Sequence, residues 1–171
     1  MTDRIDPPAH ADERTMLLAF LDYFRATLLV KADGLTDEQG RTASVPPSIL
    51  TITGLLRHMA DVERHWFQRR FAVTDAASLY WTDEDPDGDL RVDGIALADA
   101  IAAWQREVDE SRAITTTASL DDVCAVASER DGQLEWRASM RWILIHMIEE
   151  YARHAGHADL IRERIDGATG D

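Results

Sequence analysis

Residues 141–164 read RWILIHMIEEYARHAGHADLIRER, and this stretch decides the fold class. Successive residues of an α-helix turn by ~100°, so apolar residues that recur at helical spacing mark one buried face. Measured from Ile143, both Met147 and Ile161 fall within ~40° on the same side of such a helix. We expect this helix to run from Ser139 to Arg164, and Gly167 just beyond its end is a typical stop signal.

Three more stretches show the same periodicity. We expect helices over Asp12–Asp33, which Asp12 can cap, over Thr51–Phe71, and over Gly94–Ile114, which Asp93 can cap. Their apolar faces comprise Leu17, Leu21, Phe24 and Leu28; Leu55, Met59, Val62 and Trp66; and Leu97, Ile101, Trp104 and Val108. Strong strand runs and internal repeats are missing from the sequence. It therefore predicts an all-α, four-helix bundle that forms a single domain over residues 1–171, with long inter-helix loops.

The two long connections of the bundle contain turn-forming residues. Between the second and third helices, Asp83, Asp85 and Asp87 imitate the start of a calcium-binding EF-hand loop. The twelfth position of that loop needs a bidentate acid but holds Gly94, so we reject calcium sensing. In the last connection, Asp131-Gly132 could turn a small hairpin. Loops of this length are either functional lids or plain surface loops.

Composition narrows the classes of function. The 171 residues include 18 basic and 32 acidic side chains, which give a net charge of -14, and Lys31 is the single lysine. Such a surface repels nucleic acid and anionic lipid. No apolar run approaches the ~20 residues of a membrane span, and the polar start lacks the apolar core of a secretory signal. With Cys124 as its one cysteine, we expect a cytoplasmic protein, either monomer or homodimer.

Two polar residues interrupt the apolar face of the last helix. Glu150 and His154 lie within ~20° of Ile143, where an unpaired buried carboxylate would cost several kcal/mol. Residues at i and i+4 can ligate one ion together, and His58 borders the apolar face of the second helix as a third ligand. Two imidazoles and a carboxylate suit zinc, nickel or ferrous iron. Alternatively, Glu150 pairs with a core arginine and the histidines are satisfied by hydrogen bonds.

The neighbouring residues have less definite roles. His146 and His157 lie beside the same face, as spare ligands, as hydrogen-bond donors to a ligand, or as half-buried side chains. Asp61 either orients a ligand imidazole or lies on a solvated flank, and His65 is expected outside the site. We expect Trp66, Trp104 and Trp142 in the core. An anionic substrate would need an arginine contact, for which the sequence offers Arg57, Arg141 and Arg153 without choosing among them.

Three segments carry a family resemblance: LLRHMADVERHWF (55–67), LYWTDEDPDGD (79–89) and RWILIHMIEEYARHAGHADLIRERIDG (141–167). They resemble the DinB/YfiT-like superfamily, in particular its actinobacterial branch. The resemblance implies a four-helix bundle with a metal on the inner faces of the second and fourth helices.

Most members of that superfamily use three histidines, whereas Glu150 stands at the middle ligand position of this chain. That departure is similar to the metal-binding domain of the mycothiol-dependent maleylpyruvate isomerases, and the matching positions are His58, Glu150 and His154. The isomerases carry a further C-terminal domain that is not found in these 171 residues. The resemblance therefore favours the broader group of thiol-dependent S-transferases over the isomerase reaction.

We expect a metal-dependent transferase that presents mycothiol, as thiol cosubstrate, to a small electrophile. The thiol is then the nucleophile, which agrees with a sequence that has no Ser-His-Asp or Cys-His arrangement. No catalytic acid or base and no cofactor-binding residue can be named. The alternatives are a metal-stabilised binding or dimerisation domain without catalysis, and a metal-assisted hydrolase that activates water.

Overall fold

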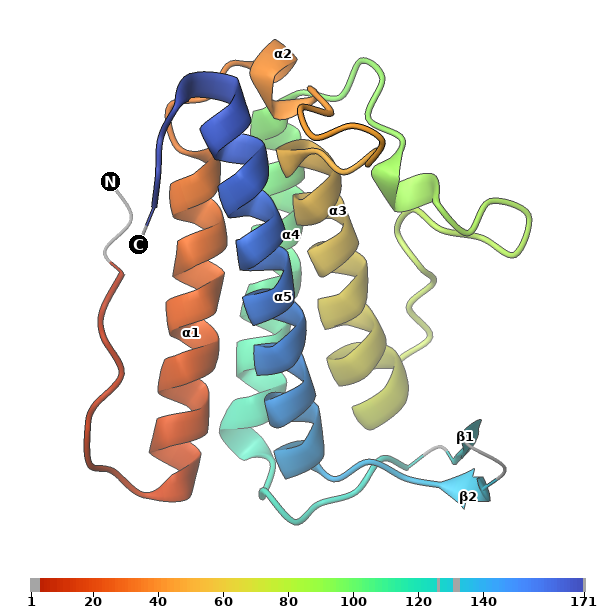
Figure 1. Cartoon of the computed structure of the whole chain (residues 1–171). Helices are drawn as coiled ribbons and strands as arrows, with labels where there is room; N and C mark the ends of the chain where they lie inside the picture. Colours follow the sequence, from red (N-terminus) through yellow and green to blue (C-terminus); the bar gives the residue numbers. More distant parts are fainter. Residues whose placement is uncertain (1–3, 126, 131–132, 171) are drawn as a thin grey trace.

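The computed structural model describes residues 4–125, 127–130 and 133–170. Four long helices lie side by side in a bundle: α1 (Glu13–Ala32), α3 (Ile52–Glu63), α4 (Leu97–Thr117) and α5 (Met140–Asp166) (Figure 1). α1 packs along α5 and α3 packs along α4, and α3 also contacts α5. α1 and α5 run in one direction and α3 and α4 in the other, because a long loop returns the chain after α3 to its starting end (Figure 1). The all-α prediction is confirmed.

The ends of the helices follow local signals in most places. Asp12 caps α1 by accepting a hydrogen bond from the Thr15 backbone N–H at 3.0 Å, and Ser139 caps α5 in the same way. Gly167, with φ +78°, ends α5. The expected start of the third helix was wrong. Gly94 adopts φ +71°, and α4 begins only at Leu97, whose backbone N–H is satisfied by the Asp37 carboxylate of the short helix α2 (Asp37–Gly40) at 2.9 Å.

The second helix changes its winding partway along. It was expected as one helix to Phe71, but from Arg64 to Phe71 the chain continues as a π-helix, η1. In a π-helix each N–H bonds to the carbonyl five residues earlier, and such turns are frequent at functional sites. The last bond of this type joins the Ala72 N–H to the Phe67 carbonyl at 2.9 Å. The winding buries Phe67 and leaves Arg69 and Arg70 half-buried.

A buried polar network joins the four long helices. Arg25 of α1 donates two hydrogen bonds of 2.8 Å to Glu63 of α3. Tyr151 of α5 donates to the same carboxylate at 2.7 Å, and Trp104 of α4 donates to the Tyr151 hydroxyl at 2.8 Å. All four residues are at most 3% exposed, so Trp104 is a core residue as predicted. Breaking a buried ion pair costs several kcal/mol, so this network favours one register of the four helices.

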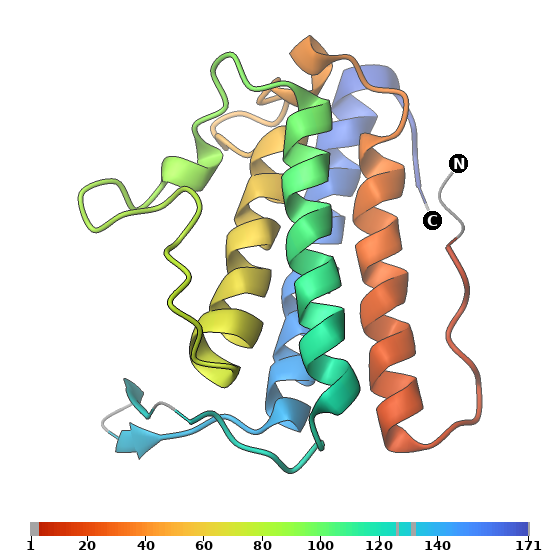
Figure 2. The ribbon, with the colours of Figure 1, turned by 180° about the vertical axis from the view of Figure 1, so that it is seen from behind.

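Both long connections project beyond α3, on the same side of the bundle (Figure 2). The first contains a turn of 3₁₀-helix, η2 (Gly88–Leu90), which packs against α3. The second forms an antiparallel hairpin of β1 (Ser128–Arg130) and β2 (Gln133–Trp136), as the sequence suggested. The turn proposed at residues 131–132 lies outside the described residues. Within the described part of the chain, no helix is long and apolar enough to cross a membrane.

Candidate metal centre

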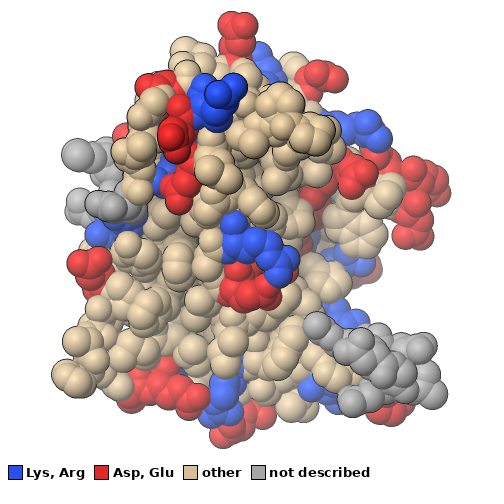
Figure 3. All heavy atoms as spheres, in the orientation of Figure 1, with Lys and Arg blue, Asp and Glu red and all other residues tan. Residues whose placement is uncertain are grey.

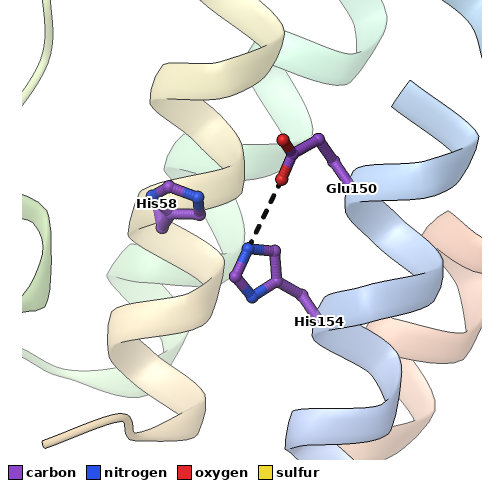
Figure 4. A group of neighbouring side chains, drawn as sticks. All are labelled: His58, Glu150 and His154. Carbon is purple, nitrogen blue, oxygen red and sulfur yellow. Dashed lines mark ion pairs between the residues drawn. The ribbon is translucent and has the colours of Figure 1, made fainter. Parts of the chain in front are cut away.

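The three residues predicted as ligands come together between α3 and α5. His58 of α3 faces Glu150 and His154, which lie one turn apart on α5 (Figure 4). One potential ligand atom from each residue lies within 4.8 Å of the other two. The Nε2 atom of His154 is 3.6 Å from a carboxylate oxygen of Glu150, and the rings of the two histidines are 4.8 Å apart.

These distances fit the donor set of a divalent metal. Two ligands bound to zinc at ~2.1 Å and at a tetrahedral angle lie ~3.4 Å apart. The His154–Glu150 separation is close to that value, and ligand atoms of all three residues lie within 4.8 Å of one another. The side chains of His58, Glu150 and His154 are 30%, 16% and 12% exposed, so the group is reachable from solvent.

Asp89 orients the His58 imidazole, and the sequence reasoning missed it. Its carboxylate lies 2.7 Å from Nδ1 of His58, which leaves Nε2 as the ligand atom. Asp89 is only 6% exposed, and Arg57 holds this turn by donating to the backbone carbonyls of Gly88 and Asp89. Gly88 allows the close approach, since a Cβ there would lie 2.2 Å from the Tyr80 carbonyl oxygen. The only signal in the sequence was an acidic loop.

Asp61, which was considered for that role, does something else. It is 4% exposed, so it is not on a solvated flank. Its carboxylate accepts backbone hydrogen bonds from Leu79 and Tyr80 at 2.6 and 3.0 Å. Burial raises the pKa of Asp61, and those hydrogen bonds oppose the increase. Asp61 therefore fixes the loop that covers the site and does not touch a ligand imidazole.

Two further imidazoles surround the ligand group. Nε2 of His146 lies 3.5 Å from the second oxygen of Glu150, and Nδ1 of His157 lies 3.3 Å from Nδ1 of His154. The hydrogen-bonding contact with His154 lowers the pKa of Glu150, although burial acts in the opposite direction. Among the described residues Glu150 forms no ion pair with an arginine, which removes the alternative role proposed for it. His146, Glu149 and Glu150 also form a compact group, but Glu149 pairs with Arg153.

Aromatic side chains form one wall of the site. The Trp66 ring lies 4.9 Å from His146 and 5.1 Å from Trp142, and His146 stacks on Trp142 at an angle of 22°. Trp66 and Trp142 are half-buried and pack against the core, at its margin. Beside them is a hollow of about 270 Å³ that is lined by His58, Asp61, Val62, His65, Trp66, Trp81, Pro86 and Asp89. His65 thus borders the hollow without joining the ligand group.

Comparisons with known proteins agree with this architecture. One solved structure, described as a conserved protein of a locus from Enterococcus faecalis, matches with a TM-score of 0.64 and 15% sequence identity, covering 93% of this chain and 100% of that one. At this identity the likeness shows the fold alone. A search among curated proteins gave no match. The family model described as mycothiol-S-transferase matches residues 16–167, nearly the whole chain. The chain therefore belongs to the mycothiol-S-transferase family.

Proposed function

We propose that this protein transfers mycothiol to a small electrophile, using a divalent metal, most simply zinc, held by His58, Glu150 and His154. The observation that carries this proposal is the cluster of three donors, of which His58 lines an accessible hollow. Structural zinc sites use four protein ligands, whereas catalytic sites use three and keep one position for water or substrate. The family match supports mycothiol as the thiol.

When bound, a divalent cation would take the sulfur of the thiol as thiolate, which is the nucleophilic form. The residues around it have definite tasks. Asp89 keeps Nε2 of His58 turned toward the centre, and His157 restrains His154 through its other ring nitrogen. Burial is the largest of the causes that lower the pKa of His157, which favours its neutral form, and a neutral imidazole can accept a hydrogen bond from His154. Trp66 and Trp81 offer flat faces that can position an electrophile and exclude water.

The first test measures whether turnover depends on the bound metal. Purified protein with zinc should consume mycothiol in the presence of 1-chloro-2,4-dinitrobenzene, and removal of the metal by a chelator should abolish this activity. His58→Ala and His154→Ala should lower both metal content and melting temperature, because the ion stabilises the folded state. His65→Ala, on the same helix, should keep its metal content. A transfer rate that is indifferent to metal removal would refute the proposal.

A second variant separates catalysis from a structural metal. Glu150→Gln keeps the side-chain volume but replaces the carboxylate by a neutral amide, which is a poorer ligand for a divalent cation. When the wild type and the variant are loaded to equal zinc occupancy, the pH at which transfer begins should differ, since the charge around the metal has changed. Stability that depends on metal, without turnover of a broad panel of electrophiles, would instead favour a non-catalytic binding domain.

A further inference from the structure

The arginines proposed from the sequence as contacts for an anionic substrate are all engaged elsewhere. Arg57 donates to two backbone carbonyls and lies 3.7 Å from the centre of the Tyr80 ring. Arg141 pairs with Glu13 and Asp121, and Arg153 pairs with Glu149. Since these contacts already use their guanidinium groups, an anion at the site would need other cations.

Arg69 and Arg70 of η1 are in a different situation. In the part of the chain that the structure describes, neither forms an ion pair, although the protein has 32 acidic side chains. Arg69 donates to the Ser78 hydroxyl at 2.6 Å and lies 5.6 Å from the centre of the Trp81 ring. Arg70 makes no hydrogen bond to any described residue. Both residues are half-buried, and neither guanidinium group has a described carboxylate as partner.

The two arginines line a hollow of about 400 Å³ at the end of η1, together with His65, Thr74, Asp75 and two alanines. Asp75 is exposed and forms no ion pair with a described residue, so the charge of the hollow is net positive. Burial is the largest cause that lowers the pKa of His65 to about 4, and the positive charges of Arg69 and Arg70 lower it further. At neutral pH this imidazole is neutral and presents hydrogen-bonding nitrogens to the hollow.

This hollow adjoins the metal centre. His65 lines both it and the smaller hollow that contains His58 and Asp89. Arg69 and Arg70 follow His58 by eleven and twelve residues, which corresponds to ~16–18 Å along a helix at 1.5 Å per residue, and His65 lies between His58 and the two arginines. Figure 3 shows basic side chains below the acidic loop on this side of the molecule. An elongated small molecule that passes His65 can therefore reach from the metal centre to the arginines.

We propose that Arg69 and Arg70 bind an anionic group, such as a carboxylate, at one end of the electrophile while its reactive carbon lies at the metal centre. Arginine suits this task because its planar fork matches a carboxylate. The anion site rests on the geometry of η1, and its assignment to the electrophile rests on the proposed function. In the probe reaction below, a carbon–sulfur bond forms, the carbon–chlorine bond breaks, chloride leaves with the electron pair, and the thiol proton passes to the buffer.

Binding without thiol tests the anion site directly. The probes are a 1-chloro-2,4-dinitrobenzene that carries a carboxylate at the end of a flexible chain of about six carbon atoms, long enough to span the two hollows, and its neutral carboxamide. The readout is quenching of tryptophan fluorescence in the zinc-loaded protein. Wild type should bind the carboxylate about tenfold more tightly than the amide, the effect of one charged hydrogen bond. Arg70→Gln and Arg69→Gln should largely remove this preference. Arg112→Gln, which loses one charge near α1, should retain it. Equal affinity of wild type for both probes would overturn the anion site.

Turnover identifies which substrate carries the anion. With mycothiol present, Arg70→Gln should raise KM for the carboxylate probe about tenfold, and leave KM for the amide probe and for mycothiol unchanged. A raised KM for mycothiol would overturn the assignment to the electrophile. Absence of turnover with either probe, while the binding preference persists, would refute the S-transferase function but support the anion site. Far-UV circular dichroism of each variant would confirm that the helices are intact.

Discussion

Asp89 gives the sharpest prediction about the metal centre. We expect Asp89→Ala to weaken zinc binding although Asp89 itself would not touch the ion. Its carboxylate holds Nδ1 of His58 at 2.7 Å, and the residue is 6% exposed. Without this carboxylate the imidazole can rotate and is a weaker base, so Nε2 is no longer held toward the ion and binds it less strongly. The turn should survive, because Arg57 holds the backbone carbonyls of Gly88 and Asp89 and not the side chain.

The magnitude follows from the kind of contact that is lost. Removing a group that orients a metal-ligating histidine raises the dissociation constant about 10- to 100-fold, or ~1.4–2.8 kcal/mol. That range agrees with ~1.5–3 kcal/mol for a hydrogen bond to a charged group. Asp89→Asn keeps an acceptor but not the charge, and charge-assisted bonds are roughly twice as strong as neutral ones, so its effect should be about half as large in free energy.

The assay is a competition for zinc between the protein and a fluorescent chelator of known affinity. Asp61→Asn is the matched control, since Asp61 is another buried carboxylate of this region and accepts hydrogen bonds from the backbone N–H groups of Leu79 and Tyr80. It should lower the free energy of unfolding while leaving the zinc affinity of the folded protein within about twofold. Wild-type zinc affinity in Asp89→Ala would refute the orienting role, and equal losses in both variants would mean that the loop as a whole, not the His58 contact, matters.

Three further predictions concern the bundle. Glu63→Ala should lower the free energy of unfolding by ~3–5 kcal/mol, because it leaves Arg25 buried without its carboxylate partner. Tyr151→Phe should lower it by ~1–2 kcal/mol, because one hydrogen bond is lost. Urea unfolding measures both changes, and near-wild-type stability of Glu63→Ala would contradict the network. The pKa of His65 is about 4 in the folded protein and 6.5 in an unperturbed histidine, so as the pH falls the unfolded chain is protonated before the folded protein. Stability of the metal-free protein should be full above pH 6.5 and fall by ~2 kcal/mol toward pH 4, and His65→Gln should show a smaller loss over that range. Burial raises the pKa of Cys124, which is 0% exposed, so iodoacetamide should label it only when urea unfolds the protein; rapid labelling of the native state would show that it is accessible.

The sequence alone determined features whose cause lies within one helix. Helical spacing of apolar residues predicted the four helices, and Asp12 caps α1 as predicted because a cap needs only the next turn of its own chain. Glu150 and His154 could be placed on one face for the same reason, since i and i+4 are neighbours in any α-helix. His58 was found because two polar residues in an apolar stripe require a partner on a facing helix.

Tertiary structure decided everything that depends on contacts between distant segments. Asp89 meets His58 from 31 residues away, and Glu63 meets Arg25 across 38 residues; periodicity within a helix contains no information about either pair. The change to π-helix after Glu63 has no marker in the sequence, yet it sets where Arg69 and Arg70 lie. Whether an arginine is paired depends on which acids the fold brings near it. The helices were therefore readable from local pattern, whereas the orientation of the ligands and the charge of the hollows follow from how loops and helices pack together.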